Sequence, residues 1–161
     1  MSEEITIRLK KRHVNQEHIM VTAKRFNVLK CGRRFGKTAL AEELIIEPAL
    51  DGFPVAYFAP TYKDLNDFWM HGLSTVKDAV ATKSEVLKQI RLITGGVIDM
   101  WSLEDPDSGR GRKYKRVVID ECEKAKKLDI AWQGTIRATL TDYIGDCWFL
   151  STPKFGDTFF K

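Results

Sequence analysis

The feature that most constrains the fold is a short loop bounded by two glycines, which lies between two apolar segments. Residues 26–31 (FNVLKC) are typical of a short buried strand. Residues 32–36 follow as the loop, and residues 37–50 then carry apolar side chains at three- and four-residue spacings, as an amphipathic helix does. The segment therefore predicts a strand, a loop and a helix in immediate succession, which indicates an α/β fold.

The rest of the chain continues this alternation of strands and helices. Further buried strands are predicted at residues 54–59, 116–120 and 146–150. Helical apolar patterns cover residues 62–81 and, with a break near Leu128, residues 121–143. Two short runs on either side of Thr94-Gly95, residues 85–93 and 96–101, predict a hairpin, and the polar residues 104–115 an exposed loop. We therefore expect an α/β domain with a mainly parallel sheet covered by helices on both faces.

Composition limits the class of protein further. The chain has 161 residues, the size of one domain with a full core. It contains no apolar run of the roughly 20 residues that a membrane span needs, and the start lacks the apolar core of a signal peptide. Lys and Arg number 26 against 22 Asp and Glu, a net charge of +4. This mild basic excess permits a nucleic-acid partner, but a basic domain without one fits equally well.

The three cysteines, Cys31, Cys122 and Cys147, are widely separated in the sequence. They form no CxxC pair, and no histidine stands at metal-ligand spacing from them. Each lies in or beside an apolar run, as a buried thiol does. We expect a reducing compartment, no zinc site and no disulfide.

The glycine-bounded loop nearly matches a known phosphate-binding pattern. Cys31-Gly32-Arg33-Arg34-Phe35-Gly36-Lys37-Thr38 fits G-x-x-x-x-G-K-[ST] at every position but the first, where Cys31 replaces the glycine. In such a loop the backbone N–H groups and the helix N-terminus bind phosphates. Lys37 would reach the β- and γ-phosphates, and the Thr38 hydroxyl would bind Mg²⁺. The alternative is a structural turn, but its place between a strand and a helix favours nucleotide binding.

A pair of carboxylates follows a second buried strand. Asp120 and Glu121 come directly after Val117-Val118-Ile119, at the edge where ligands bind in open α/β sheets. Asp120 suits Mg²⁺, and Glu121 can orient or deprotonate the water that attacks the γ-phosphate. Alone, such a pair would more often begin a helix. Beside the phosphate-binding loop it indicates ATP hydrolysis.

With these motifs in place, residues 16–153 resemble the large terminase subunit, the DNA-packaging motor of tailed bacteriophages. The resemblance is carried, in order, by Cys31–Thr38, Ala59-Pro60-Thr61-Tyr62, Ser108-Gly109-Arg110-Gly111 followed by Tyr114, Val117–Glu121 and Ser151-Thr152-Pro153. It implies a P-loop NTPase fold of the ASCE type, in which residues 31–38 are the Walker A motif and residues 117–121 the Walker B motif. Ser151 and Thr152 would form the coupling motif.

The resemblance also implies roles for single residues. Gln16 corresponds to the glutamine that contacts adenine, although an ordinary surface glutamine is an equal alternative. Arg33 corresponds to a loop arginine that contacts the γ-phosphate, whereas Arg34 could equally be a surface charge. Arg110 resembles an arginine finger donated to a neighbouring subunit, with rivals at Arg112 and Arg137, and the alternative for this loop is a solvated turn or a DNA contact. Ser151 and Thr152 would sense the γ-phosphate or the attacking water, or else cap a helix.

The resemblance implies ATP and Mg²⁺ as cofactors and double-stranded DNA, the portal protein, the small terminase subunit and other copies in a ring as partners, with no membrane. It places the protein in the cytoplasm of the infected bacterial host and outside the mature virion. Only eight residues follow Pro153, so residues 1–161 are expected to be a fragment, the ATPase domain without a C-terminal nuclease domain.

Two other functions remain open from the sequence. A helicase-type nucleic-acid translocase shares the Walker motifs and a Ser/Thr motif, and a nucleotide-dependent module without catalysis shares the fold. A kinase ranks last, because no lid for an acceptor is evident. The run at residues 123–127 (EKAKK) is interpreted as a solvated helix face, with DNA contact as a weaker alternative.

Overall fold

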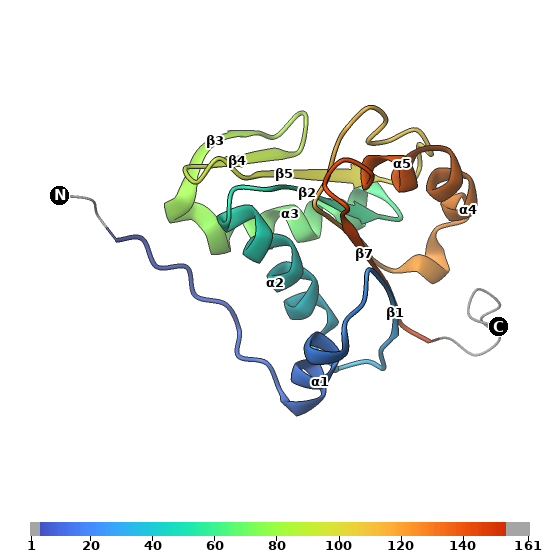
Figure 1. The fold of residues 1–161 in the computed structure, drawn as a ribbon, viewed down its shortest axis with the longest axis horizontal. Coiled ribbons are helices and arrows are strands. Elements are labelled where there is room, and N and C mark those ends of the chain that lie inside the picture. The colour runs from blue at the N-terminus through green and yellow to red at the C-terminus, as the bar shows by residue number, and fades with distance from the viewer. Residues whose placement is uncertain (1–3, 154–161) are drawn as a thin grey trace.

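The computed structural model describes residues 4–153 (Figure 1). The α-helices are α1 (Val14–Thr22), α2 (Lys37–Leu50), α3 (Tyr62–Val76), α4 (Leu128–Ala131) and α5 (Arg137–Thr139). The strands are β1 (Phe26–Lys30), β2 (Pro54–Ala59), β3 (Val80–Ser84), β4 (Gln89–Leu92), β5 (Val97–Ser102), β6 (Arg116–Ile119) and β7 (Asp146–Ser151). Two 3-10 turns are η1 (Lys77–Ala79) and η2 (Cys122–Lys124), and η3 (Trp132–Ile136) is a π-helical turn.

All seven strands form one sheet, in the order β1-β7-β6-β2-β5-β4-β3. The first five strands of this order are parallel to one another. β4 is antiparallel to both of its neighbours, β5 and β3. The hairpin expected near residues 85–101 is present as β4 and β5. The predicted α/β class with a mainly parallel sheet is therefore confirmed.

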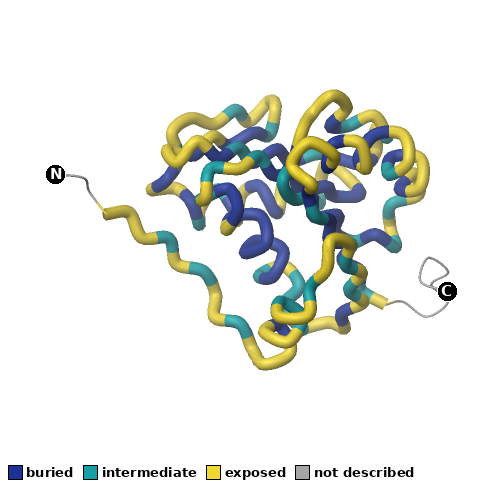
Figure 2. The backbone as a smooth tube through the Cα atoms, viewed as in Figure 1, coloured by how far each residue is buried: buried dark blue, intermediate teal, exposed yellow. Residues whose placement is uncertain are grey.

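The core lies on both faces of the sheet, which explains why the central strands are continuous apolar runs. In β2, Val55, Tyr57 and Ala59 belong to the cluster under α2 and α3, whereas Ala56 and Phe58 belong to the cluster on the opposite face with α4 and η3. Successive side chains of a strand point to opposite faces, so a strand covered on both faces needs apolar residues at every position. Figure 2 shows α2 and the central strands as the most buried part of the backbone.

The prediction that residues 26–31 form a buried strand is wrong for most of their length. Strand β1 pairs only with β7 and lies at one edge of the sheet. Phe26 and Val28 are 46% and 59% exposed. An apolar run marks a strand, but its place in the sheet depends on distant pairing partners.

Two of the expected helices are shorter than their apolar patterns. The helix predicted at residues 62–81 ends at Val76, and the chain turns through η1 into β3, an edge strand that the sequence did not predict. Its residues are mostly exposed and do not alternate, so the pairing with β4 defines the strand. Within residues 121–143, the short turn η2 precedes a continuous helical segment made of α4, η3 and α5, so the expected break near Leu128 is confirmed, and the segment ends at Thr139.

The N-terminal part of the chain adds features that the sequence analysis did not assign. Residues 4–13 run as an extended segment toward α1, at the lower end of the molecule in Figure 1. Arg12 fastens this segment to α2, because its guanidinium pairs with Glu43 and also lies 3.3 Å from Glu17. The Glu43 hydrogen bond raises the pKa of Arg12 further above its already high value, so the guanidinium is charged at neutral pH.

Cys31, Cys122 and Cys147 are buried and free, as expected. Burial raises the pKa of each thiol above its usual value. Among residues 4–153 no helix has the length and apolar character needed to cross a membrane.

Candidate nucleotide-binding and catalytic site

The loop before α2 has the backbone of an anion-binding turn. Arg34 and Gly36 have positive φ angles of 67° and 85°, and Gly36 is the N-cap of α2. A Cβ atom at Gly36 would also lie 2.9 Å from Gln16 Nε2 and would displace the end of that side chain, but the positive φ angle is the reason for glycine there. The loop therefore presents the N-terminus of a 14-residue helix to the space above it.

The structure also explains why Cys31 can replace the first glycine of the pattern. The Cys31 N–H donates to the Ser151 carbonyl at 2.9 Å, which extends the β1–β7 pairing by one residue. Cys31 is 5% exposed and does not have a positive φ angle. Because this position behaves as the end of a strand, a small buried side chain fits there.

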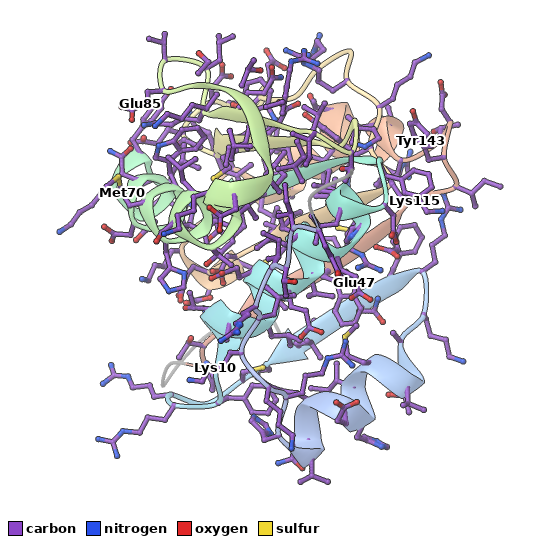
Figure 3. The ribbon with its side chains drawn as sticks, turned by 90° about the vertical axis from the view of Figure 1, so that its left-hand side faces the viewer. Lys10, Glu47, Met70, Glu85, Lys115 and Tyr143 are labelled. Atoms are coloured by element: carbon purple, nitrogen blue, oxygen red, sulfur yellow. The ribbon has the colours of Figure 1, made fainter. Side chains whose placement is uncertain are left out.

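The loop lines a cavity of about 590 Å³. Its walls contain all of residues 32–38, together with Arg8 and Lys10 of the N-terminal segment and Thr152 after β7. Glu42 and His71, which contact each other between α2 and α3, line the same cavity. Figure 3 shows Lys10 on the extended segment beside α2. The cavity is thus rich in cations and large enough for a nucleotide.

Lys37 joins the two Walker motifs. Its Nζ atom lies 3.0 Å from Asp120 Oδ1 and also pairs with Glu121. Burial opposes the charge on the ammonium group, but the two carboxylates raise the pKa of Lys37 above its usual value. Burial likewise opposes the charge of Glu121, but hydrogen bonds to Glu123 and Lys37 lower the pKa of Glu121 to about 2. Lys37 and Glu121 are therefore both ionised at neutral pH.

Asp120 and Glu121 are fixed by their backbone and by one buried tyrosine. The Tyr57 hydroxyl donates to Asp120 Oδ2 at 2.9 Å, and the Glu121 N–H donates to Asp120 Oδ1, also at 2.9 Å. Glu121 has a φ of 49°, a left-handed conformation that costs a non-glycine residue free energy and is frequent at functional sites. Burial and the Asp120 carboxylate raise the pKa of Tyr57, so its hydroxyl stays a donor.

The residues expected to bind Mg²⁺ have suitable chemistry. Thr38 and Asp120 supply hard oxygen donors, and proteins bind Mg²⁺ with one or two such groups plus phosphates and water. Within residues 4–153 no cluster of three or more His, Cys, Asp or Glu side chains could hold a metal by itself. The donor set therefore fits a magnesium ion that arrives with a nucleotide better than it fits a resident metal.

The coupling-motif residues lie beside both Walker motifs. Ser151 is fully buried, and its hydroxyl donates to Glu123 Oε2 at 2.6 Å. Thr152 lines the cavity above the P-loop. The interpretation of residues 123–127 as a solvated helix face is wrong at its start, because Glu123 points into the site and Lys124 Nζ lies 3.5 Å from Glu121 Oε2. The sequence carried no signal for Glu123 apart from its position two residues after Glu121.

Gln16 lies under the phosphate-binding loop and is buried. Its Nε2 donates to the carbonyls of Phe35 at 3.3 Å and Gly36 at 3.2 Å, and its Oε1 accepts from the His13 N–H at 3.1 Å. The side chain therefore supports the loop from behind. Its expected contact with adenine stays a prediction.

The candidate arginines are in different places. Arg33 and Arg34 are exposed and line the P-loop cavity. Arg110 lies in the loop after β5, with its side chain 67% exposed and 2.6 Å from Asp107 Oδ1. It lines a separate cavity of about 370 Å³, together with Arg112, whereas Arg137 is exposed on α5. The structure thus brings the Walker motifs, Gln16 and the coupling motif together but does not bring Arg110 to them.

The loop that carries Arg110 is fixed at both ends. Gly109 has a φ of 86°, and a Cβ there would lie 3.2 Å from Phe58. At the other end the buried Tyr114 hydroxyl donates to Asp99 Oδ2 at 2.6 Å and accepts from Trp101 Nε1 at 2.9 Å. Burial and the Asp99 carboxylate raise the pKa of Tyr114, which keeps this network intact at neutral pH. The exposed part of the loop, which carries Arg110, is therefore anchored to buried residues on both sides.

Known proteins resemble this chain in sequence and in fold. The large terminase subunit of Escherichia phage T5 is 29% identical over 142 residues, which cover 84% of this chain and 32% of that protein. The chain thus spans about a third of the length of this curated relative. No protein-family model matches the chain.

Two solved structures share the fold. The large terminase ATPase domain of Thermus phage P74-26 matches with a TM-score of 0.72 and 23% identity, over 90% of this chain and 66% of that one. The large terminase of a thermophilic bacteriophage, solved in complex with ADP, matches with a TM-score of 0.62 and 13% identity, over 81% of this chain and 34% of that one. These findings confirm the resemblance to large terminase subunits and the P-loop NTPase fold.

Proposed function

We propose that the chain is the ATP-hydrolysing motor domain of a viral terminase large subunit, which powers translocation of double-stranded DNA into procapsids. The observation that carries this proposal is the position of Lys37, 3.0 Å from Asp120 and paired with Glu121. A cation after a phosphate-binding loop and two carboxylates after a second strand of the same sheet are the parts that ATP hydrolysis requires. The similarity to terminases favours this motor over a helicase-type translocase.

The phosphates of ATP bind the N–H groups of residues 32–38 and the Lys37 ammonium group. On binding, Lys37 exchanges the carboxylates of Asp120 and Glu121 for the β- and γ-phosphates. Arg33, on the exposed side of the loop, contacts the γ-phosphate within the same subunit. Gln16 contacts adenine only if its amide releases the loop carbonyls that it now binds.

Thr38 and Asp120 would hold Mg²⁺ through their oxygen atoms, and the ion would supply positive charge to offset that of the phosphates. The Tyr57 hydroxyl keeps the Asp120 carboxylate in place, because it occupies one of its two oxygens.

Glu121 orients the attacking water and accepts its proton. Its carboxylate is ionised at neutral pH, and its side chain is 22% exposed. Loss of the Lys37 contact when ATP binds removes one of the interactions that stabilise the charge, so the carboxylate becomes a stronger base at that moment.

Arg110 acts as a finger toward the ATP of a neighbouring copy in a ring on the portal. This arrangement agrees with an exposed arginine on a rigid loop, away from the P-loop cavity of its own chain. Arg112 and Arg137 are the alternatives. Ser151 and Thr152 transmit hydrolysis to the rest of the motor, and no nuclease activity is expected from residues 1–161.

The partners that follow from this function are double-stranded DNA, the portal protein, the small terminase subunit and further copies of the chain. The protein acts in the cytoplasm of the infected bacterial host and is absent from the mature virion.

The test is packaging of double-stranded DNA into portal-bearing procapsids by a terminase that carries this chain. Packaged DNA is measured as the fraction that resists added nuclease. The proposal predicts ATP-dependent protection that Glu121→Gln abolishes. Strand separation of a duplex without protection would support the helicase alternative, and protection independent of ATP would contradict a motor.

A further inference from the structure

Glu123 lies between the coupling motif and the catalytic carboxylate. Its Oε2 accepts the hydrogen bond of the buried Ser151 hydroxyl at 2.6 Å. Its Oε1 is buried, and no residue in the described part of the chain donates a hydrogen bond to it. The carboxyl groups of Glu123 and Glu121 interact directly, so burial and this neighbour raise the pKa of Glu123. A partly buried carboxyl group that has one oxygen without a hydrogen-bond partner and lies against a second carboxyl group costs free energy.

The backbone explains how these groups meet. Strands β6 and β7 are parallel and in register, with Ile119 opposite Phe149. Ser151 extends two residues beyond that pair, while the positive φ of Glu121 turns the chain into η2 and returns Glu123 toward β7. The Ser151 carbonyl also accepts the Cys31 N–H at 2.9 Å. Ser151 is therefore joined to the P-loop strand through its backbone and to the Walker B turn through its side chain.

We propose that Glu123 is a positioning residue that couples Ser151 to Glu121. While Ser151 holds Oε2, the Glu123 carboxylate stays on the β7 side of the turn, and Glu121 keeps the position from which it contacts Lys37. When Ser151 shifts, the Glu123 carboxyl group loses the donor that holds it on the β7 side and moves relative to the neighbouring Glu121 carboxylate. Movement of β7 relative to the Walker B turn is thereby translated into movement of the group that orients water. This inference rests on the proposed ATP hydrolysis and names the contact through which the coupling motif acts.

The test is a double-mutant cycle read out in steady-state ATP hydrolysis. Glu123→Ala and Ser151→Ala are each expected to lower kcat about tenfold and to change KM for ATP by less than about threefold, because the contact affects the reacting geometry more than binding. The double variant is expected to be no slower than either single variant, since both remove the same contact. Glu123→Gln retains an acceptor for the Ser151 hydroxyl and should restore kcat to within about threefold of the unmodified chain.

The control is Glu85→Ala, which removes an exposed glutamate from the turn between β3 and β4 (Figure 3) and should leave both constants unchanged. If Glu123→Ala does not fold, as judged by its circular dichroism, Glu123→Met takes its place in the cycle, because it also removes the acceptor for the Ser151 hydroxyl. In that case Ser151→Ala alone and its combination with Glu123→Met are expected to have the same kcat.

Two outcomes overturn the inference while the proposed function stands. One is a double variant whose loss of kcat is the product of the single losses, about a hundredfold, which means that the residues act independently. The other is an unchanged kcat in the single variants, which makes the contact structural only. Failure of the proposed function is different, because the unmodified chain would then hydrolyse no more ATP than Glu121→Gln.

Discussion

Lys37 Nζ lies 3.0 Å from Asp120 Oδ1, so a single ammonium group joins the loop before α2 to the carboxylate after β6. The two residues are 83 positions apart in the sequence and follow β1 and β6, which are not neighbours in the sheet because β7 lies between them. The contact fixes the distance between the groups that would hold the phosphates and the metal.

Lys37→Ala is therefore expected to weaken ATP binding by roughly ten- to a hundredfold, because a charge-assisted hydrogen bond of about 1.5–3 kcal/mol is lost. Titration calorimetry with ATP and Mg²⁺ measures the effect. Lys126→Ala, which removes an exposed lysine, is the control and should bind as the unmodified chain does. Equal affinity of Lys37→Ala and the control would contradict the assigned role.

Gly36 and Gly32 offer a matched pair of loop variants. Gly36→Ala is expected to lower the free energy of unfolding by about 1–2 kcal/mol, the cost of a left-handed residue with a side chain. Gly32→Ala should have little effect on stability, because a Cβ there meets nothing within 4 Å and the φ angle is not positive. Urea unfolding of both variants measures the difference, and equal stabilities would show that the loop does not require glycine at residue 36.

The Tyr57 hydroxyl is expected to stabilise Asp120. Tyr57→Phe keeps the stacked contact with Phe68, whose ring centroid lies 3.7 Å away, and removes only the hydrogen bond. The free energy of unfolding should fall by about 1.5–3 kcal/mol, the range for a hydrogen bond to a charged group. Urea denaturation provides the measurement, and Tyr62→Phe, which alters a tyrosine that is 62% exposed, is the control. A loss no larger than that of the control would mean that Asp120 does not depend on Tyr57.

Arg110 acts between subunits in this account, which mixing experiments can detect. Arg110→Ala and Glu121→Ala should each be inactive, with rates lowered about a thousandfold or more, as expected for loss of an arginine finger. A mixture of the two should recover part of the ATPase rate, because a subunit with an intact Glu121 can receive Arg110 from its neighbour. The rate is measured at concentrations that allow assembly. No recovery in the mixture, or inactivity of Arg112→Ala or Arg137→Ala in place of Arg110→Ala, would assign the finger elsewhere.

The sequence predicted most of the site because its chemistry is local. A loop between a strand and a helix defines the phosphate-binding turn, and carboxylates directly after a buried strand must lie at the edge of a parallel sheet. These two rules alone place Lys37, Thr38, Asp120 and Glu121 at one edge, where the structure has them. The continuous apolar runs likewise predicted β2, β6 and β7, since strands covered on both faces need no alternation.

The features that the sequence analysis missed depend on partners far along the chain. Strand β3 has a polar sequence and exists because it pairs with β4. β1 has the apolar sequence of an inner strand but lies at the edge. Glu123 stands in a run of charges that resembles any solvated surface, and only the approach of Ser151 gives it a role. None of these long-range contacts produces a periodic pattern or a motif in the sequence.

The central claim is that Glu121 is required for hydrolysis and not for binding. The most direct test is to measure ATP affinity and the rate of phosphate release on the same preparation of Glu121→Gln, with Mg²⁺ and under assembling conditions. The account predicts an affinity close to that of the unmodified chain and a rate lowered by at least about a hundredfold, as for loss of a general base. Phosphate release at the unmodified rate, or loss of ATP binding together with turnover, would contradict it.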